Sequence, residues 1–425
     1  MLELHKSKMK PNQSQKNISK EWQTRKLDSM FTVRRGGSPR PIESYITNRA
    51  DGLNWLKIGD IDVGAKYITK TSSKILKEGL SRTTLVKKGD FILSNSMSFG
   101  RPYIMGIDSC IHDGWLTFQD IKTNILDRDF LYYLLSQSKT QAIFTSISAG
   151  SGVQNLKKET VSGVVLSIPP LPEQNRIVAV LETWDKAIEN LNKKIEIKKQ
   201  IKKGLMQDLL TGKKRLSGFK EKWETKTLGD VSDFINGYTF KSGNYVDGGK
   251  YKIITIANVQ DGFMFIDEPK TINELPENIG KEQILKKGDI LISMTGNVGR
   301  VCVVNSDNCL LNQRVGKIMT KDINKELLYL FLYDRRFLYQ MIGSAQGGAQ
   351  ANLSTEDIKE YIFDLPKTKE EQNAVAEILT TADKEITELE KKLSIIKDQK
   401  KFLLNNLITG AIRTPVNMQL YGKIV

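Results

Sequence analysis

The sequence predicts an α+β fold in which one plan occurs twice: two similar α+β domains separated by two long antiparallel coiled-coil helices, with a pseudo-two-fold internal repeat. The prediction rests first on a repeated stretch. "EQNRIVAVLET" at 173–183 returns as "EQNAVAEILTT" at 371–381, and at the same offset "LLTG" at 209–212 falls on "LITG" at 407–410 without a gap. About 20 of the 43 positions from 173 to 215 are identical in the second copy.

Both copies also have the apolar spacing of a coiled-coil helix, in steps of four and three residues. The seam of the first copy is Ile177, Leu181, Trp184, Ile188, Leu191, Ile195, Leu205 and Leu209. The matching positions of the second are Val375, Leu379, Ala382, Ile386, Leu389, Leu393, Leu403 and Leu407. Each helix would span about 38 residues, roughly 57 Å at 1.5 Å per residue. Because each follows a globular segment of similar length, antiparallel pairing is the simplest arrangement.

Start and stop signals bound the two helices. Pro172 stands where the first turn of a helix tolerates proline. Thr368 stands three residues before Glu371, the spacing of a capping box. Gly212 and Gly410 follow the last periodic residues and predict the helix ends.

The globular segments repeat more faintly. "EWQTRKL" at 21–27 matches "KWETKTL" at 222–228, and "KKGDFILSNSMSFGR" at 87–101 matches "KKGDILISMTGNVGR" at 286–300. Short β-rich runs between Gly, Asp and Asn surround these motifs. We therefore expect a shared framework with different loops. The predicted segments are a flexible basic tail at 1–20, domains at 21–171 and 217–367, a helical spacer at 172–216, and a second spacer with a C-terminal tail at 368–425.

Composition bounds the class of protein. The chain has 39% hydrophobic residues, a net charge of +15 and a pI near 9.4. Such a charge favours a polyanionic partner, and nucleic acid more than a membrane. The alternative is a lysine-rich surface that only contacts solvent. The same alternative applies to the lysine run at 192–203. The first 20 residues lack the apolar core of a signal peptide, and no segment approaches the roughly 18 apolar residues of a membrane span. We expect a cytoplasmic protein without membrane contact.

Signals for catalysis are missing from the sequence. The only histidines are His5 and His112, and the three cysteines, Cys110, Cys302 and Cys309, have no metal-ligand spacing. Neither a Walker loop nor a G-x-G-x-x-G dinucleotide motif occurs. The sequence therefore predicts no catalytic residue, no metal site and no bound cofactor.

Two kinds of polar motif are candidates for DNA contact. Each "KKGD" is followed by an apolar strand, small polar residues and an arginine, which suits phosphate and base-edge contacts. The glycine-rich stretches at 150–158 and 346–353 carry Gln and Asn, which can pair with adenine. The alternatives are an ordinary hairpin with turn-forming Asp90 and Asp289, and helix caps at Asn155 and Asn352.

The candidate residues fall in both domains. Those of the first domain are Lys87, Lys88, Ser94, Asn95, Ser96, Arg101, Gln154 and Asn155. Those of the second are Lys286, Lys287, Ser293, Thr295, Asn297, Arg300, Gln346 and Gln350.

From about residue 21 to residue 413 the pattern resembles the specificity (S) subunit of type I restriction-modification systems. The resemblance rests on two globular segments, each followed by a helix opening, "PLPEQ" at 170–174 or "EEQ" at 370–372, and closing with "LLTG" or "LITG". In the second copy "LPKTKEEQ" replaces "PPLPEQ", which affects only the helix cap.

The resemblance implies a division of labour. Each globular segment would be a target-recognition domain that reads one half of a bipartite site in double-stranded DNA. The helices would set the spacing and dock two methyltransferase subunits, which carry S-adenosylmethionine and methylate adenine at N6. ATP and Mg would bind a restriction subunit where one is present, and this chain would bind no cofactor.

Two other classes remain as alternatives to this interpretation. One is a non-catalytic structural adaptor, in which a helical hairpin joins two protein-binding domains. The other is a self-contained methyltransferase or nuclease, against which the missing cofactor motifs count.

Overall fold

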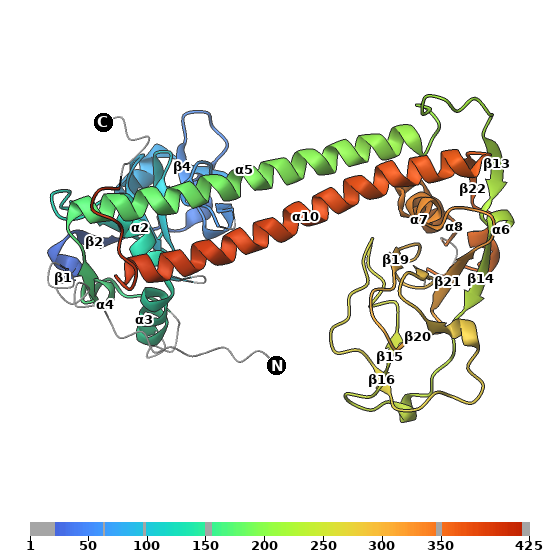
Figure 1. Ribbon diagram of the computed structural model, residues 1–425. Helices are drawn as coiled ribbons and strands as arrows, with labels where there is room; N and C mark the ends of the chain where they lie inside the picture. The colour runs from blue at the N-terminus through green and yellow to red at the C-terminus, as the bar shows by residue number, and fades with distance from the viewer. Residues whose placement is uncertain (1–21, 63, 97–98, 149–154, 346–350, 419–425) are drawn as a thin grey trace. The chain divides into compact units, whose positions relative to one another are not determined.

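The computed structural model forms two compact units. Unit 1 comprises residues 1–191 and 392–425, and unit 2 comprises residues 192–391. Both long helices, α5 (Leu171–Leu209) and α10 (Lys369–Ile408), contribute one part to each unit (Figure 1). The structure describes residues 22–62, 64–96, 99–148, 155–345 and 351–418.

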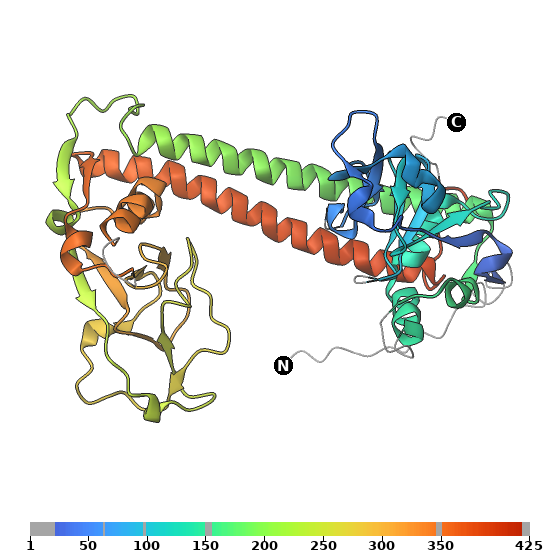
Figure 2. The ribbon, with the colours of Figure 1, turned by 180° about the vertical axis from the view of Figure 1, so that it is seen from behind.

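Unit 1 contains, among its described residues, two five-stranded sheets and a two-stranded ribbon. The first sheet has the order β2 (Thr32–Arg35), β11 (Trp115–Gln119), β8 (Phe91–Ser94), β9 (Pro102–Met105) and β5 (Tyr67–Ile68). The second has the order β3 (Ile46–Thr47), β6 (Ser73–Ile75), β4 (Leu53–Leu56), β10 (Ser109–Ile111) and β7 (Thr84–Val86). The ribbon pairs β1 (Gln23–Lys26) with β12 (Val165–Ile168). Figures 1 and 2 show the strands from β1 to β11, blue to cyan, from opposite sides.

Helices cover the first sheet of unit 1 and close its main core. They are α2 (Arg128–Ser136), α3 (Ser138–Ser148), α4 (Lys158–Ser162) and the 3-10 turn Leu27–Ser29. Further 3-10 turns of unit 1 are Ile42–Ser44, Ile58–Asp60 and Lys77–Arg82. The core joins stacked rings of the sheet, such as Phe91 and Phe118, to Phe130 of α2. Leu181 of α5 and Leu407 of α10 belong to the same core, so both long helices are part of the packing of unit 1.

Unit 2 repeats this topology with shorter sheets. Its first sheet has the order β14 (Ser232–Asn236), β21 (Val315–Thr320), β18 (Ile290–Ser293) and β19 (Val301–Val303). Its second has the order β16 (Thr271–Ile272), β15 (Tyr251–Ile254), β20 (Cys309–Leu311) and β17 (Ile284–Leu285). The ribbon pairs β13 (Glu224–Thr227) with β22 (Ile362–Leu365). In both units the second sheet contains one parallel pair of strands, β10 with β4 in unit 1 and β20 with β15 in unit 2. The predicted duplicated α+β fold is confirmed.

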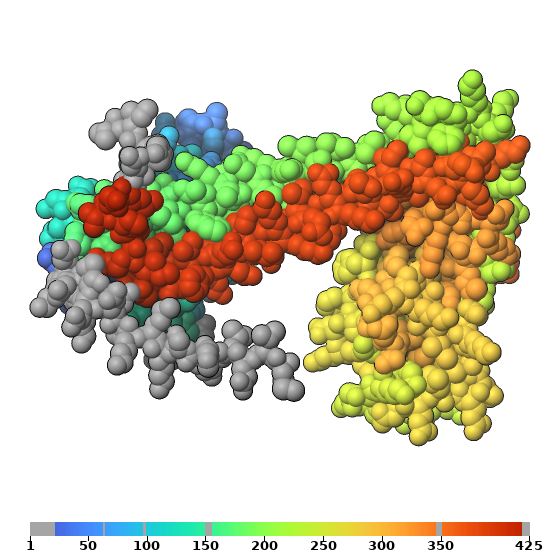
Figure 3. Space-filling model, viewed as in Figure 1, coloured from blue at the N-terminus to red at the C-terminus, as the bar shows by residue number. Residues whose placement is uncertain are grey.

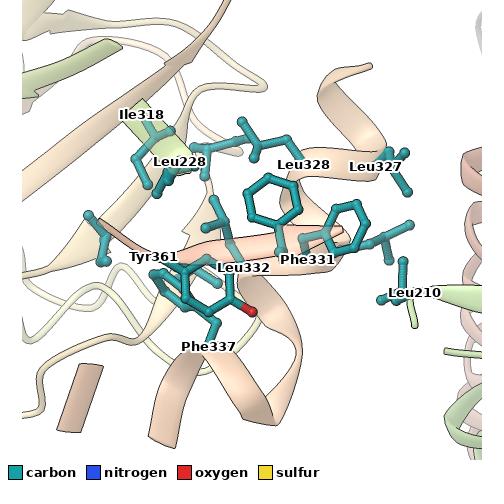
Figure 4. Close-up of a cluster of buried hydrophobic side chains, with 14 of the residues drawn as sticks. Leu210, Leu228, Ile318, Leu327, Leu328, Phe331, Leu332, Phe337 and Tyr361 are labelled. Atoms are coloured by element: carbon teal, nitrogen blue, oxygen red, sulfur yellow. The ribbon is translucent and has the colours of Figure 1, made fainter. Parts of the chain in front are cut away.

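The core of unit 2, like that of unit 1, lies between the first sheet and helices. Its helices are α6 (Leu228–Val231), α7 (Lys325–Tyr333), α8 (Arg335–Ser344) and α9 (Thr355–Lys359), with 3-10 turns at Ser242–Asn244 and Lys281–Gln283. Figure 4 shows Phe331, Phe337 and Tyr361 in this core. The Phe337 and Tyr361 rings meet edge to face, 4.8 Å between centroids. Such aromatic pairs add about 0.5–1.5 kcal/mol beyond the area they bury.

The predicted seam of the long helices is confirmed within each unit. All the predicted seam positions are buried or half-buried. In unit 2, Lys198 pairs with Glu385 at 2.8 Å and Lys202 with Asp383 at 2.5 Å, so residue numbers fall along α10 as they rise along α5. This is antiparallel packing. The lysine run therefore forms ion pairs with α10 rather than a purely solvated face. Figure 3 shows α5 in green beside α10 in orange-red.

The helix ends follow the predicted signals. Gly212 and Gly410 adopt positive φ angles of 64° and 72°, which glycine tolerates best. The Thr368 hydroxyl accepts a hydrogen bond from the Glu371 amide at 3.3 Å. The predicted caps at Asn155 and Asn352 are wrong. Ser354 caps α9, with its hydroxyl accepting from Asp357 N at 3.0 Å, and the N-cap residue of α4 is Lys157.

The glutamine of each "EQ" ties a long helix to its domain. Gln372 accepts a hydrogen bond from Asn324 N at 3.0 Å and donates to Pro366 O at 2.9 Å. Gln174 likewise accepts from Asp127 N at 2.8 Å and donates to Pro169 O at 2.8 Å. Asn324 and Asp127 are the N-cap residues of α7 and α2, so the same contact aligns two helices in each unit.

The glutamate of each "EQ" holds the end of the other long helix. In unit 2 the Arg215 guanidinium donates two hydrogen bonds of 2.7 Å to Glu371, and Trp223 Nε1 donates a third at 3.2 Å. In unit 1 Arg413 and Trp22 make the same contacts with Glu173. Each guanidinium also lies over its tryptophan ring, 5.5 and 5.4 Å from the centroid. We call Arg215–Glu371–Trp223 and Arg413–Glu173–Trp22 the clamps.

Breaking a clamp is expected to destabilise the fold. Glu371 is fully buried, so Glu371→Ala leaves Arg215 and Trp223 without their acceptor. Removing one partner of a buried ion pair costs several kcal/mol, and because Arg215 is partly exposed we expect a loss of about 2–4 kcal/mol. Urea unfolding of the full chain measures it. The exposed neighbour is the control: Glu370→Ala should cost less than about 1 kcal/mol, and equal losses for both variants would show that the clamp contributes nothing.

Candidate nucleic-acid interface

Four polar segments meet at one end of the sheets in unit 1. Asn95 directly follows β8. Its backbone N–H donates to Gly114 O at 3.0 Å, and its backbone carbonyl accepts from Leu156 N at 2.9 Å. Gly37 N donates to Ile111 O at 3.2 Å, which adds the loop after β2. We call residues 36–40, 94–96, 112–114 and 155–156 the polar end of unit 1.

Unit 2 builds its polar end with the same backbone bonds. Met294 N donates to Arg314 O at 3.0 Å, and Leu353 N donates to Met294 O at 2.8 Å. Tyr238 N donates to Leu311 O at 2.8 Å. The polar end of unit 2 therefore consists of residues 237–241, 293–297, 312–314 and 351–353.

A glycine allows the loops to approach this closely in each unit. A Cβ atom on Gly36 would lie 2.1 Å from His112 O, and one on Gly237 would lie 1.9 Å from Asn312 O. No side chain fits at either position, so the close approach requires glycine.

The predicted serines are framework residues in this geometry. Ser94 and Ser293 are 1% and 0% exposed, and each hydroxyl accepts from the backbone amide of Arg101 or Arg300 at 3.1 Å. These hydroxyls shape the turn and do not emerge on an exposed loop as the sequence suggested. Asn95 is also buried and donates from Nδ2 to Asp113 O at 3.0 Å. Direct DNA contact by these residues stays a prediction.

Other predicted residues at the polar ends reach the surface. Asn297 and Arg101 are exposed, and Ser96 and Thr295 are half-buried beside them. Arg300 is half-buried and donates to Gln260 Oε1 at 2.9 Å. These side chains remain candidates for contact.

The predicted lysines lie at the opposite end of the same strands. Lys87 Nζ is 3.0 Å from Asp108, and Lys287 Nζ is 2.7 Å from Asp307. Each "KKGD" aspartate accepts from a turn amide, Asp90 at 2.8 Å and Asp289 at 2.9 Å, so the turn interpretation is confirmed. The remaining lysines of the two turns, Lys88 and Lys286, lie with them, so the structure does not bring the lysines together with the polar ends.

The glycine-rich stretches are only partly described. Gln154, Gln346 and Gln350 lie outside the described residues. Asn155 is the first described residue of its stretch, and Asn352 forms an antiparallel β-bridge with Thr295. Both stretches therefore lead into the polar ends.

Sequence reasoning missed a charged cluster at the polar end of unit 1. The Asp113 carboxylate accepts from Ser38 Oγ at 2.9 Å and lies 3.7 and 3.8 Å from the guanidinium groups of Arg35 and Arg40. Burial opposes ionisation of Asp113, but the Ser38 bond and the charge of Arg35 outweigh it and lower the pKa of this carboxyl. Burial lowers the pKa of His112, which is therefore neutral at pH 7. The run "RRGGSPR" at 34–40 was the available signal.

Unit 2 presents different side chains at the same place. Lys241, Gln313 and Arg314 are exposed, and Tyr238 is half-buried. Among the residues that the structure describes, none pairs with the Arg314 guanidinium. These residues share no local motif with unit 1, so only alignment of the two copies could have indicated them.

The three cysteines are poorly suited to nucleophilic chemistry in this arrangement. All three are buried, and burial raises the pKa of the Cys110 thiol to about 11 and that of Cys302 to about 12. Thiols with such pKa values carry almost no thiolate at neutral pH and are poor nucleophiles.

In addition, no helix within the described parts of the chain is long and apolar enough to cross a membrane.

Duplicated α+β domains with exposed polar ends, joined to paired long helices, define a binding protein with two similar recognition modules. The family model for the type I restriction modification DNA specificity domain matches residues 19–199 and 220–397. The chain therefore belongs to this family and carries two copies of its domain, which confirms the resemblance seen in the sequence.

Curated relatives and solved structures agree with this assignment. The specificity subunit of type I restriction enzyme MjaVIII from Methanocaldococcus jannaschii is 27% identical over 375 residues, which cover 82% of this chain and 86% of the relative. The EcoBI specificity subunit from Escherichia coli is 21% identical over 388 residues, covering 85% and 79%. The S subunit from M. genitalium has the same fold, with a TM-score of 0.54, 19% identity and coverage of 94% and 98%. A chain from a structure that describes the assembly of a type I R-M system has a TM-score of 0.60 and 18% identity. The match covers 92% of this chain and 98% of that chain.

The close approach at Gly237 makes a stability prediction. Gly237→Ala places a methyl group 1.9 Å from Asn312 O, so the backbone must move. We expect the free energy of unfolding in urea to fall by about 1–3 kcal/mol. Gly243→Ala is the matched control, since nothing lies within 4 Å of its Cβ, and should change stability by less than about 0.5 kcal/mol. Similar values for the two variants would mean that the loop adapts without cost.

Proposed function

We propose that this chain is the sequence-specific DNA-binding specificity subunit of a type I restriction-modification complex. The observation that carries the proposal is the family match in two copies, each on one α+β domain. In this proposal the target-recognition domains are residues 21–171 and 217–367, and each reads one half of a bipartite site in double-stranded DNA.

Electrostatics support DNA as the partner. The net charge is +15, and a protein that neutralises DNA phosphates gains affinity by releasing condensed counterions. Exposed Arg34, Arg101 and Arg314 add cations at or beside the polar ends, where hydroxyl and amide groups also lie. Such a mixture serves both phosphate and base-edge contacts. An adaptor for two protein partners would not need this charge. DNA as the target would place the protein in the cytoplasm.

The long helices would act as a spacer and as a docking surface. Unbroken helices of 39 and 40 residues would extend about 60 Å at 1.5 Å per residue, more than one turn of DNA of about 34 Å. We propose that they set the gap between the half-sites and dock two methyltransferase subunits. Those subunits would carry S-adenosylmethionine, and a restriction subunit, where present, would bind ATP and Mg. This chain supplies specificity and does not catalyse methylation by itself.

Deleting the gene tests the proposal. We expect methylome sequencing of cells with the gene to reveal a bipartite motif with N6-methyladenine in both halves, and this motif should vanish in the deletion strain. Reintroducing the gene should restore it. An unchanged methylome, together with no affinity of the purified complex for duplex DNA, would favour the adaptor.

Lengthening both helices tests the spacer role. Four residues inserted into each, near residue 191 of α5 and residue 392 of α10, add about one turn and 6 Å. We expect the gap of the methylated motif to grow by about one or two base pairs, each being about 3.4 Å, with both half-sites unchanged. The same four residues inserted at the C-terminus serve as the control. An unchanged gap in the helix variant would show that the helices do not set it.

A further inference from the structure

The turn between the second and first sheets is equivalent in the two units. It comprises His112–Gly114 between β10 and β11, and Asn312–Arg314 between β20 and β21. Each turn closes with the same backbone bond, Trp115 N to His112 O at 3.1 Å and Val315 N to Asn312 O at 2.8 Å. The third residue of each turn accepts from the residue after β8 or β18, at 3.0 Å in both units. The backbone therefore holds both triplets in one geometry.

Much of the surrounding framework is identical in the two units. Ser94 corresponds to Ser293, and Arg101 corresponds to Arg300, with the same hydrogen bonds. Identical residues in identical places offer DNA the same contacts. They cannot make one unit prefer a base that the other rejects. Residues that give the two units different half-sites are expected where the side chains differ, and a shared framework at such a place allows them to be exchanged between the units.

The triplets meet that condition. His112 and Asp113 of unit 1 present a neutral imidazole and a carboxylate, whereas Gln313 and Arg314 of unit 2 present an amide and a cation above a buried Asn312. The signs of charge at the two turns are therefore opposite. In the major groove a carboxylate accepts from cytosine N4, glutamine pairs with adenine, and arginine pairs bidentately with guanine. The two turns thus suit different bases.

The side chains of both turns are placed to accept a ligand. Gln313 and Arg314 are exposed, and the Gln313 carbonyl accepts from Asn312 Nδ2 at 2.7 Å, so the Gln313 amide hydrogens are not used in that bond. In unit 1, Asp113 Oδ1 accepts from Ser38, while its Oδ2 lies 3.7 and 3.8 Å from arginine groups, beyond hydrogen-bond length. That oxygen can accept from a base.

We propose that these triplets are base-reading elements that distinguish the half-site of unit 1 from that of unit 2. This inference rests on the proposed function and adds the residues that determine specificity. The polar ends around the triplets supply the framework and the phosphate contacts. Exchange of the triplets should therefore exchange base preference while the fold, the gap and the other half-site stay the same.

The test exchanges the triplet in the full complex. The variant H112N/D113Q/G114R gives unit 1 the turn of unit 2. Gly114 needs the whole exchange, because a Cβ there would lie 2.3 Å from the His112 ring, which His112→Asn removes; the other close atom, Ser96 Oγ at 2.9 Å, ends a short side chain. Methylome sequencing is expected to show one altered half-site, with the other half-site and the gap retained. Asp108→Asn, at the lysine end of the same unit, is the control and should retain the whole motif.

The reciprocal variant completes the design. N312H/Q313D/R314G is expected to alter the other half-site. If both exchanges methylate DNA at the wild-type motif, the triplets do not read bases and the inference is wrong. A wild-type complex without any bipartite motif would instead refute the proposed function.

A single substitution keeps the test decisive if the exchanges do not fold. Arg314→Gln removes an exposed side chain, so folding should be unaffected, and circular dichroism checks this. We expect the discrimination of the purified complex at one base pair to fall by about five-fold to a hundred-fold in binding to a library of sites. Unchanged discrimination at every position, or weaker binding that is uniform across all sequences, would overturn a base-reading role for this residue.

Discussion

The structure depends on one buried carboxylate in each unit. Glu173 and Glu371 stand at the starts of the long helices with side chains almost removed from water, and an unpaired charge there would be costly. Each is satisfied by an arginine that follows the end of the other long helix. Neither unit can therefore bury its own carboxylate without both helices. The clamps couple the two repeats in a way that the packing of apolar seams alone would not specify.

The clamps and the shared backbone bonds separate stability from recognition. The glutamate, glutamine, arginine and tryptophan contacts recur in both units, as do the serine turns and the close glycine approaches. None of them uses the exposed side chains of the polar ends. Because the cores and clamps supply the folding free energy, loop residues can change without a large loss of stability. The differences between His112 and Asn312, or between Gly114 and Arg314, are of this kind.

The parts of the fold that follow a period or a repeat could be predicted from the sequence. The seam from Ile177 to Leu209 and the glycine stops are local patterns, and the structure confirms them. The clamps were not predicted, because Glu371 and Arg215 are distant in sequence and each also fits a simpler role at a helix end. Ser94 and Ser293 were predicted as DNA contacts, and their burial could not be predicted because a strand end does not reveal which way its last hydroxyl points. The triplets were missed because they share no residue type, only a place in the backbone.

Lysines of the scaffold and arginines of the polar ends differ in how their charge is used. Several lysines of the run at 192–203 and of the "KKGD" motifs form intramolecular ion pairs. Lys198 and Lys202 pair with α10, and Lys287 pairs with Asp307. Arg314 at the polar end of unit 2 is exposed and has no partner among the described residues. Arginine is also the side chain that reads guanine bidentately, whereas lysine acts as a point charge. The cations that best combine attraction to DNA with base discrimination are therefore at the polar ends, and the paired lysines stabilise the scaffold that presents them.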